Sequence, residues 1–356
     1  MLQLYLIKSI DYLQAIMESL EYLLKGGFKP KRSFYIAFGH DEEGQGIDGA
    51  QEIAKVFKAR GVTFEYLLDE GMMIFKDQFY GVKDDVAVVG VSEKGFLTVK
   101  VKATGTVGHS SMPETNTAIT RLARAVAKLT GDAHPNLFGL GPERTMIESF
   151  ARHASYPAKL VYSNLWLFSP ILSRVFASRP STNALVRTTS AVTIIKGGVK
   201  DNILPSGAEA VVNHRIHPMQ SVREVFAYDM ALIGDEQVQV EVKGDSNEPH
   251  PLSPYDSDAF GYQTISRSLR QVFADTIVIP GVLVATTDTR WYLPITKAVY
   301  RFSPSVLTEK DMGRFHGNNE RISVDNYMKT VNFYHHIMLN SDHSELAGGR
   351  PTKDEL

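Results

Sequence analysis

The sequence predicts an α/β domain that is interrupted by a smaller α+β domain. Near the N-terminus, two buried-strand patterns flank a helix pattern, which is typical of a parallel strand–helix–strand unit. From about residue 94 the pattern changes to a half-exposed strand in which apolar and polar residues alternate. After a proline-rich stretch at 249–254, buried-strand and helix patterns return. We therefore expect one domain to be inserted into another.

The first part of the α/β domain is expected to contain two helices and two strands. Apolar residues recur at helical spacing over 13–24, where Gly26 and Gly27 end the helix. An aromatic and β-branched run at 33–38 predicts a buried strand, and a second helix and strand follow at 47–60 and 64–68. Acidic residues follow both strands directly, so we expect them at the carboxyl edge of a parallel sheet, where open α/β folds bind ligands.

Three of these acidic residues are candidates for a metal site, namely Glu42, Glu43 and Asp69. Each one alone could equally be a solvated loop carboxylate. The adjacent pair favours a site, because two neighbouring carboxylates repel each other unless one binds a cation while the other takes a proton from metal-bound water.

The inserted domain is expected to combine antiparallel strands with helices. Its first strand, 96–103, alternates between apolar and polar residues. Its other strand patterns lie at 191–195, 208–212 and 238–242. Its helix patterns lie before 129, in several segments up to 187, and at 222–232. The second part of the α/β domain has strand patterns at 276–279 and 298–302 and a helix pattern at 324–339.

Composition excludes several classes of protein. With 38 Lys and Arg against 40 Asp and Glu, the chain has no basic field for nucleic acid. Cys is absent, so any metal must be held by His and carboxylates. The longest apolar stretch, Leu160–Phe176, is too short and too polar to span a membrane. Plain helix packing and a groove for an acyl chain are both open interpretations of this stretch.

The two ends of the chain give different indications of its location. Lys353–Leu356 has the sequence of an endoplasmic reticulum retention signal, although a charged tail that arose by chance has the same appearance. Met1–Ile7 is apolar but lacks the basic leader of a signal peptide. We expect the lumen of the endoplasmic reticulum or the secretory pathway if a signal peptide is missing from this chain.

Seven short motifs occur in a characteristic order along the chain. They are Gly39–Glu43, Leu68–Gly71, Gly108–Pro113, Asp201–Pro205, Asn213–Pro218, Thr287–Arg290 and Phe315–Glu320. In these motifs the chain resembles the two-zinc M20 metallopeptidases, which include carboxypeptidase S and the aminoacylases. The segment Leu165–Thr189 is most similar to the N-fatty-acyl-amino-acid synthase/hydrolase branch.

The resemblance implies an exopeptidase-like catalytic domain with an inserted ferredoxin-like lid through which two subunits dimerise. The catalytic domain would take up 1–92 and 248–342, the lid 93–247, and a tail 343–356. The implied activity is cleavage, or reversible formation, of the amide bond of N-acyl amino acids or small peptides. Two zinc ions are the implied cofactors, because zinc polarises a scissile carbonyl and activates water.

The resemblance also assigns roles to residues of the catalytic domain. Glu42 matches the general base. Glu43 and His316 match ligands of one zinc ion, and Asp69 matches a ligand of the other. Arg290 either pairs with Asp288 to shape its loop or touches the substrate, and both roles stay open.

In the lid, His109 matches the residue that stabilises the oxyanion in the active site of the partner subunit. Asn202 and Arg215 match the groups that hold the free carboxylate of the substrate. Three further histidines inside the motifs match no ligand and are expected to be structural, namely His40, His214 and His217.

One departure from the family limits what the resemblance implies. A His-x-Asp motif and a bridging Asp are expected upstream of the first helix, yet no His precedes His40 and Asp11 is the only Asp before Asp41. Either the sequence is part of a complete enzyme, or the protein is a non-catalytic dimerisation or amino-acid-binding module. With this ligand set we expect no amidase activity from the chain alone, and an unpaired sheet edge beside 33–38.

Overall fold

The computed structural model describes residues 2–6, 10–314 and 318–343. His316 and the Lys353–Leu356 tail lie outside the described residues. The chain forms two compact units. Unit 1 comprises Met1–Ser92, Arg144–Phe168 and Pro251–Leu356, and unit 2 comprises Glu93–Glu143 and Ser169–His250. The sequence placed all of 93–247 in one domain, whereas the structure groups Arg144–Phe168 with unit 1.

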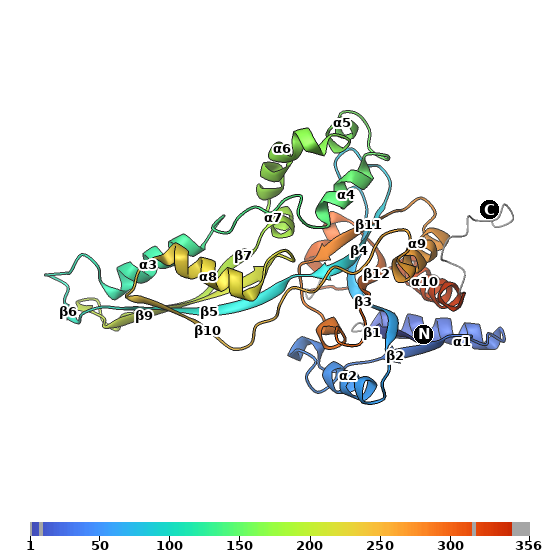
Figure 1. Ribbon diagram of the computed structural model, residues 1–356, viewed down its shortest axis with the longest axis horizontal. Coiled ribbons are helices and arrows are strands. Elements are labelled where there is room, and N and C mark those ends of the chain that lie inside the picture. Colours follow the sequence, from blue (N-terminus) through green and yellow to red (C-terminus); the bar gives the residue numbers. More distant parts are fainter. Residues whose placement is uncertain (1, 7–9, 315–317, 344–356) are drawn as a thin grey trace. The chain divides into compact units, whose positions relative to one another are not determined.

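Unit 1 contains a six-stranded mixed sheet of order β11-β4-β12-β3-β1-β2 (Figure 1). Its strands are β1 (Leu2–Leu6), β2 (Ser33–Ala37), β3 (Phe64–Phe75), β4 (Val86–Glu93), β11 (Ile277–Leu283) and β12 (Val299–Leu307). Strand β1, whose sequence matches no motif, pairs in parallel with both β2 and β3. Within the described residues β2 has β1 as its single neighbour, so β2 is an edge strand, as expected for 33–38.

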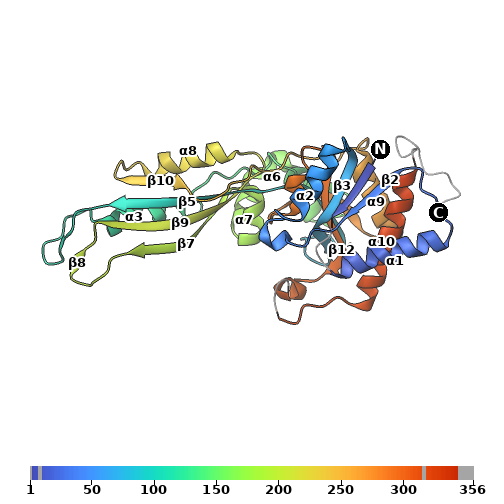
Figure 2. The same ribbon diagram turned by 90° about the horizontal axis from the view of Figure 1, so that it is seen from below.

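Helices cover both faces of this sheet. Successive residues of β3 point to opposite faces and therefore pack against different helices. Tyr66 and Leu68 pack with α1 (Ile10–Lys25), α9 (Phe260–Val272) and α10 (Val324–Asp342). Leu67 packs on the other side with α2 (Ala50–Ala59). Figure 2 shows the three larger helices beside the sheet. The helices expected at 13–24 and 324–339 are confirmed, and the one expected at 47–60 begins at Ala50.

Unit 2 contains a four-stranded antiparallel sheet of order β10-β5-β9-β7. Its strands are β5 (Gly95–Thr104), β7 (Thr189–Gly197), β9 (Gly207–Ile216) and β10 (Val238–Val242). Burial alternates strictly along β5, as its sequence predicts. The helices α3 (Ala118–Leu129) and α8 (Val222–Ile233) pack side by side on one face. A short ribbon of β6 (Gly108–His109) and β8 (Ile203–Leu204) completes the unit.

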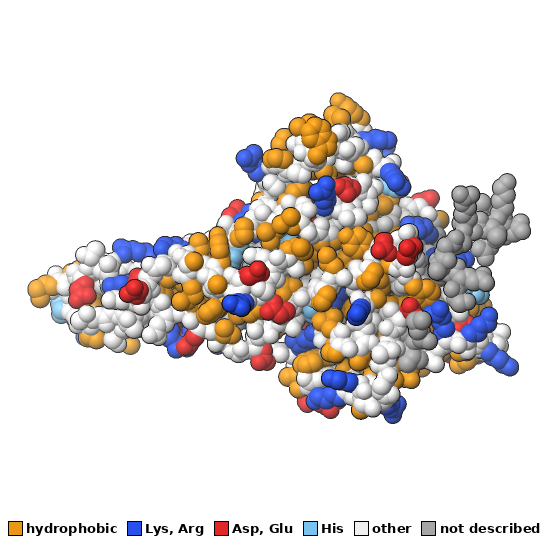
Figure 3. Space-filling view, viewed as in Figure 1, with side chains coloured by type: hydrophobic (Ala, Val, Ile, Leu, Met, Phe, Trp, Pro, Cys, Tyr) orange, Lys and Arg blue, Asp and Glu red, His pale blue; other side chains and the backbone are white. Residues whose placement is uncertain are grey.

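Four further helices occupy the region that the sequence predicted as helical up to residue 187. They are α4 (Glu143–Phe150), α5 (Ala158–Tyr162), α6 (Leu165–Ala177) and α7 (Pro180–Val186). Helix α6 exposes several large apolar side chains, including Trp166 at 78% and Ile171 at 56%, and hydrophobic side chains gather over this region in Figure 3. Among the described residues, helices of the length and hydropathy needed to cross a membrane are not found.

Candidate functional site

The loop after β2 carries Glu42 and Glu43 at the carboxyl end of that strand. A 3₁₀ turn, η1 (Glu42–Gly44), forms because the Asp41 carbonyl accepts hydrogen bonds from the backbone N–H groups of Gly44 at 2.8 Å and of Gly46 at 2.9 Å. Glu42 is half-buried and Glu43 is exposed. The turn therefore presents two adjacent carboxylates in different environments.

Asp288 packs directly against this loop and determines which residues the loop accepts. Gly46 has a φ of +64°, and a Cβ atom placed there would lie 2.0 Å from Asp288 Oδ1. Only glycine adopts this backbone conformation easily and leaves room for the carboxylate. Asp288 is 6% exposed and begins η2 (Asp288–Trp291). The loop is thus folded around the buried carboxylate of Asp288, a residue of the motif Thr287–Arg290 whose contact with this loop the sequence did not predict.

Arg290 contacts the same loop. Its guanidinium donates a hydrogen bond to the Gln45 carbonyl, and Trp291 Nε1 donates to the same oxygen at 3.0 Å. These contacts join Arg290 to the loop after β2 and test neither of the two roles left open for it. Substrate binding by Arg290 stays a prediction.

Asp69 lies inside β3, whereas the sequence placed it after the end of a shorter strand. The strand continues to Phe75 through an irregularity opposite Arg301 and Phe302 of β12. Asp69 is 4% exposed. Its Oδ1 accepts a hydrogen bond from the backbone of Glu70 at 2.8 Å, while its Oδ2 is buried without a hydrogen-bond partner among the described residues.

The electrostatic environment of Asp69 disfavours its ionised form. Burial raises its pKa well above the ordinary value, and the charges of Glu70 and Asp288 act in the same direction. Arg301, which lies opposite Asp69 in the sheet and is fully buried, lowers the pKa. Since negative charge still exceeds positive charge here, a bound cation would stabilise the ionised carboxylate.

Sequence reasoning missed Arg301. This side chain donates hydrogen bonds to Thr289 Oγ1 at 2.8 Å and to the Val299 carbonyl at 3.2 Å. It therefore connects β12 to η2 beside the candidate carboxylates. The sequence could have indicated it, because Arg301 is the single charged residue of the strand Val299–Leu307. A buried strand accommodates a charged side chain only where that charge has partners.

In unit 2, His109 and Asn202 lie close together. Pairing of β6 with β8 places His109 opposite Ile203, and the Ser110 N–H donates to the Asn202 carbonyl at 3.1 Å. The Ser111 N–H donates to His109 Nδ1 at 3.2 Å. Because Nδ1 is an acceptor, the neutral ring carries its proton on Nε2, and the exposed ring can donate a hydrogen bond from that atom.

Arg215 occupies a different part of unit 2. It lies near the end of β9, opposite Phe96, whereas the chain enters β9 at Gly207 directly after β8. Eight residues of extended strand span roughly 27 Å. The structure therefore does not bring Arg215 together with Asn202 within one chain.

The surroundings of Arg215 are rich in positive charge. Lys94 is fully buried and donates hydrogen bonds to two backbone carbonyls, those of Ala184 at 2.9 Å and Arg187 at 2.8 Å. Burial and the nearby Arg215 charge lower the pKa of Lys94 to about 7. Glu93 is the carboxylate whose charge acts on Arg215, and it also pairs with His250 at 3.7 Å.

Comparison with known proteins decides the family. The peptidase dimerisation domain matches residues 91–241. The N-fatty-acyl-amino acid synthase/hydrolase PM20D1 of Bos taurus is 42% identical over 336 residues, which cover 94% of this chain and 67% of the relative. The chain belongs to the M20 metallopeptidase family. Within it, PM20D1.1 of Danio rerio is 46% identical over 338 residues, or 94% of this chain and 65% of the relative.

Solved M20 structures share the fold. The M20 family metallo-carboxypeptidase Sso-CP2 from Sulfolobus solfataricus aligns with a TM-score of 0.64 at 14% identity, over 96% of this chain and 85% of that chain. Human carnosine dipeptidase 1 aligns with a TM-score of 0.57 at 15% identity, over 96% and 79%. The expected α/β fold with an M20 dimerisation domain is confirmed. The chain spans about two thirds of the length of the curated relatives that it matches.

M20 metallopeptidases imply a metal, so the candidate ligands must be tested against the structure. Asp69, with its buried unbonded oxygen, fits a cation. Three ligand atoms do not converge at Glu42, Glu43 and Asp69. Within the described residues, the group whose three ligand atoms lie close together is in unit 2. His316 is outside the described residues. The described residues therefore do not complete a two-zinc centre, and the general-base and ligand roles stay predictions.

Proposed function

We propose that the protein acts in metal-dependent hydrolysis, or reversible formation, of the amide bond of N-acyl amino acids. The observation that carries this proposal is the position of Arg215 beside the buried Lys94. Lys94 and Arg215 repel each other, while Glu93 is shared with His250. A carboxylate bound by the planar Arg215 guanidinium would relieve that repulsion.

In this proposal, Glu42 is the general base and the metal is zinc. Half-burial of Glu42 beside the exposed Glu43 separates the two carboxylates into a proton acceptor and a ligand. Asp69 and His316 supply the remaining ligands from this chain, and oxygen and imidazole donors suit zinc. Asp288 and Arg290 hold the loop that positions Glu42.

The distance between Arg215 and Asn202 supports a site built from two copies of the chain. One substrate carboxylate contacts both residues only if they come from different subunits. The match to a peptidase dimerisation domain supports a homodimer. His109 and Asn202 would then act in the active site of the partner, where Nε2 of His109 donates a hydrogen bond to the developing oxyanion.

The exposed apolar residues of α6 suit an acyl chain. Trp166, Leu167 and Ile171 are more than half exposed on one helix, whereas Leu165 is buried. The names of the Danio rerio and Bos taurus relatives specify fatty acyl groups. Of the two interpretations of Leu160–Phe176, we propose contact with an acyl chain for this exposed face, while Leu165 and Leu172 are buried as in ordinary helix packing.

Calorimetric titration tests the carboxylate anchor without requiring turnover. We expect an N-acyl amino acid to bind the 356-residue chain at least 10-fold more tightly than the same compound with its carboxylate converted to an amide. In Arg215→Met the preference should vanish, and in the control Arg223→Met, which changes an exposed arginine on α8, it should persist. Equal binding of acid and amide to the unchanged chain would refute the anchor.

A non-catalytic dimerisation or amino-acid-binding module is the second candidate. It is favoured by the lack of a three-ligand group in the described part of unit 1. A chimera that joins a segment with the His-x-Asp motif and bridging Asp of an active M20 enzyme to the N-terminus of this chain separates the two candidates. Zinc-dependent amide hydrolysis by the chimera supports the enzyme, whereas a folded, zinc-loaded and inactive chimera supports the module.

A further inference from the structure

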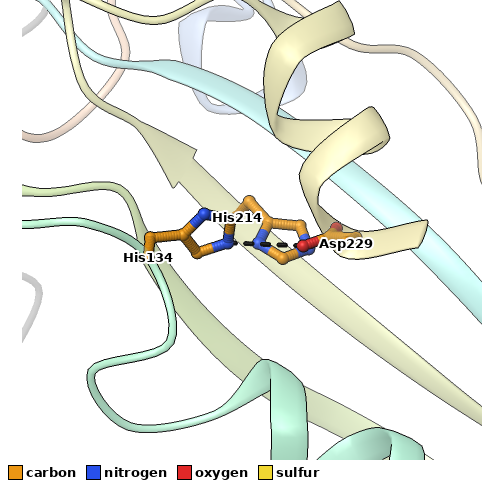
Figure 4. Close-up of side chains that lie close together, drawn as sticks. All are labelled: His134, His214 and Asp229. Carbon is orange, nitrogen blue, oxygen red and sulfur yellow. Dashed lines mark ion pairs between the residues drawn. The ribbon is translucent and has the colours of Figure 1, made fainter. Parts of the chain in front are cut away.

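Three buried side chains in unit 2 converge in a way that none of the assigned roles explains. His134 lies in the loop after α3, His214 on β9 and Asp229 on α8, and Figure 4 shows them facing one another. Their side chains are 1%, 0% and 0% exposed. One ligand atom from each lies within 4.8 Å of the others. Nothing in the sequence motifs singled out His134 or Asp229.

Of the two nitrogen–oxygen distances in the cluster, one equals the separation expected between ligands of a tetrahedral ion and the other is somewhat shorter. Nε2 of His214 lies 3.0 Å from Oδ2 of Asp229, and Nε2 of His134 lies 3.4 Å from Oδ1. Two donors that bind zinc at its usual distances of 2.0–2.2 Å with tetrahedral angles are roughly 3.3–3.5 Å apart. Each carboxylate oxygen faces a different imidazole, so one ion between them would meet two nitrogens and both oxygens.

Hydrogen bonding alone does not account for the cluster. In the described part of the chain, Nε2 of both histidines and both oxygens of Asp229 are buried without a hydrogen bond of acceptable geometry. The two nitrogen–oxygen distances lie within the range of ion pairs. Burying such polar atoms unsatisfied is costly, whereas direct bonds to a cation satisfy them together.

The charge of the cluster also suits a cation. The Asp229 carboxylate brings a negative charge into the buried interior, where one imidazole nitrogen faces each of its oxygens. A divalent ion would compensate that charge.

Residues around the cluster fix the orientation of its members. Ser190 Oγ lies 2.9 Å from Nδ1 of His214, which leaves Nε2 of that ring to face Asp229. The Arg187 guanidinium donates to the His134 carbonyl at 3.0 Å, and Tyr228 donates to the Ala133 carbonyl at 3.1 Å. Such hydrogen bonds to the outer nitrogen and the backbone of ligating histidines are typical of metal centres.

We propose that His134, His214 and Asp229 bind a structural divalent metal ion, with zinc as the preferred ion, inside the dimerisation unit. Two imidazoles and a carboxylate form a donor set that suits zinc, cobalt and nickel and does not suit calcium or magnesium. Because the ligands are fully buried, the ion has no access to substrate. It cross-links the loop after α3, strand β9 and helix α8.

Cobalt titration of the metal-stripped chain tests this site. The background is the full 356-residue chain carrying Asp69→Asn, which removes the buried carboxylate of unit 1. We expect one equivalent of cobalt to bind with the strong visible absorption of tetrahedral Co(II), and added zinc to displace it. Circular dichroism checks that every variant is folded.

Variants assign the ion to the three residues. His134→Gln and Asp229→Asn should each lose the tetrahedral spectrum, and Ser190→Ala should weaken binding by about 10–100-fold while the spectrum is kept. The controls are His153→Gln and Asp235→Asn, which change residues outside the cluster and should bind as tightly as the background. If Asp229→Asn fails to fold, loss of the spectrum in His134→Gln and weaker cobalt binding in Ser190→Ala still test the site. A stripped chain that binds no cobalt, or binding that all these variants retain, would overturn the proposal.

Discussion

Replacing Gly46 by alanine should disrupt the loop that carries Glu42, and Gly61 provides a matched control. Both glycines have a left-handed backbone, with φ of +64° and +65°. A Cβ at Gly61 has no neighbour within 4 Å, whereas one at Gly46 would lie 2.0 Å from Asp288 Oδ1. The two substitutions therefore share the backbone penalty and differ in the collision.

The expected magnitudes follow from these distances. The left-handed conformation costs alanine about 1 kcal/mol, so Gly61→Ala should lower the free energy of unfolding by about that amount. At Gly46 the carboxylate must retreat by roughly 1.3 Å to reach an ordinary carbon–oxygen contact of about 3.3 Å. Overpacking of this kind costs about 1–3 kcal/mol more. The total for Gly46→Ala is about 2–4 kcal/mol.

Urea unfolding followed by tryptophan fluorescence measures the difference. The chain has two tryptophans, and Trp291 contacts the loop, so fluorescence in a Trp166→Phe background reports on the surroundings of this loop. In an Asp288→Ala background the collision is absent, and Gly46→Ala should cost no more than Gly61→Ala. Equal costs for the two glycines in the Trp166→Phe background, or a penalty at Gly46 that persists without the Asp288 carboxylate, would refute the reasoning.

Three further predictions concern charge and assembly. Burial raises the pKa of Asp69, so ionisation of this carboxylate destabilises the fold. In metal-free protein, the free energy of unfolding gained by Asp69→Asn should therefore grow as the pH rises above about 4. A gain that stays constant with pH in urea unfolding would contradict this. The pKa of Lys94 is lowered to about 7 in the folded chain, against 10.5 in the unfolded chain, so the folded chain binds fewer protons between these pH values. The unchanged chain should therefore gain stability relative to Lys94→Met between pH 7 and pH 10.5. A stability difference independent of pH would show that Lys94 stays charged. Mixing inactive Glu42→Gln and His109→Ala forms of the chimera should restore about a quarter of its activity if the two residues act in different subunits, and no recovery would place both in one subunit.

Much of the fold could be predicted because burial leaves a periodic record in the sequence. Residues 96–103 alternate and form the half-exposed strand β5, and 13–24 has helical spacing and lies within α1. Boundaries were harder to predict. Strand β3 continues past Asp69, since its irregular pairing with β12 accommodates Glu70 and Gly71, which the sequence predicted to end it.

The candidate site was only partly predictable, because its geometry depends on contacts that are distant in sequence. The motif with Glu42 pointed to the loop after β2, but not to the Asp288 carboxylate that contacts Gly46. Arg301 and Asp229 lie in no motif. Tertiary packing places Arg301 near Asp69, and Asp229 beside the His214 ring. His214 was expected to be structural, and its meeting with His134 required the folded chain.

The central claim is that Glu42 transfers the proton in a metal-dependent amide hydrolysis. Its most direct test is release of the free amino acid from an N-acyl amino acid by the zinc-loaded chimera and by its Glu42→Gln form, with zinc content measured in both. We expect turnover by the chimera, and a loss of roughly 10²–10⁴-fold in Glu42→Gln with its zinc content unchanged. Near-normal turnover of Glu42→Gln, or loss of zinc from it, would contradict the account.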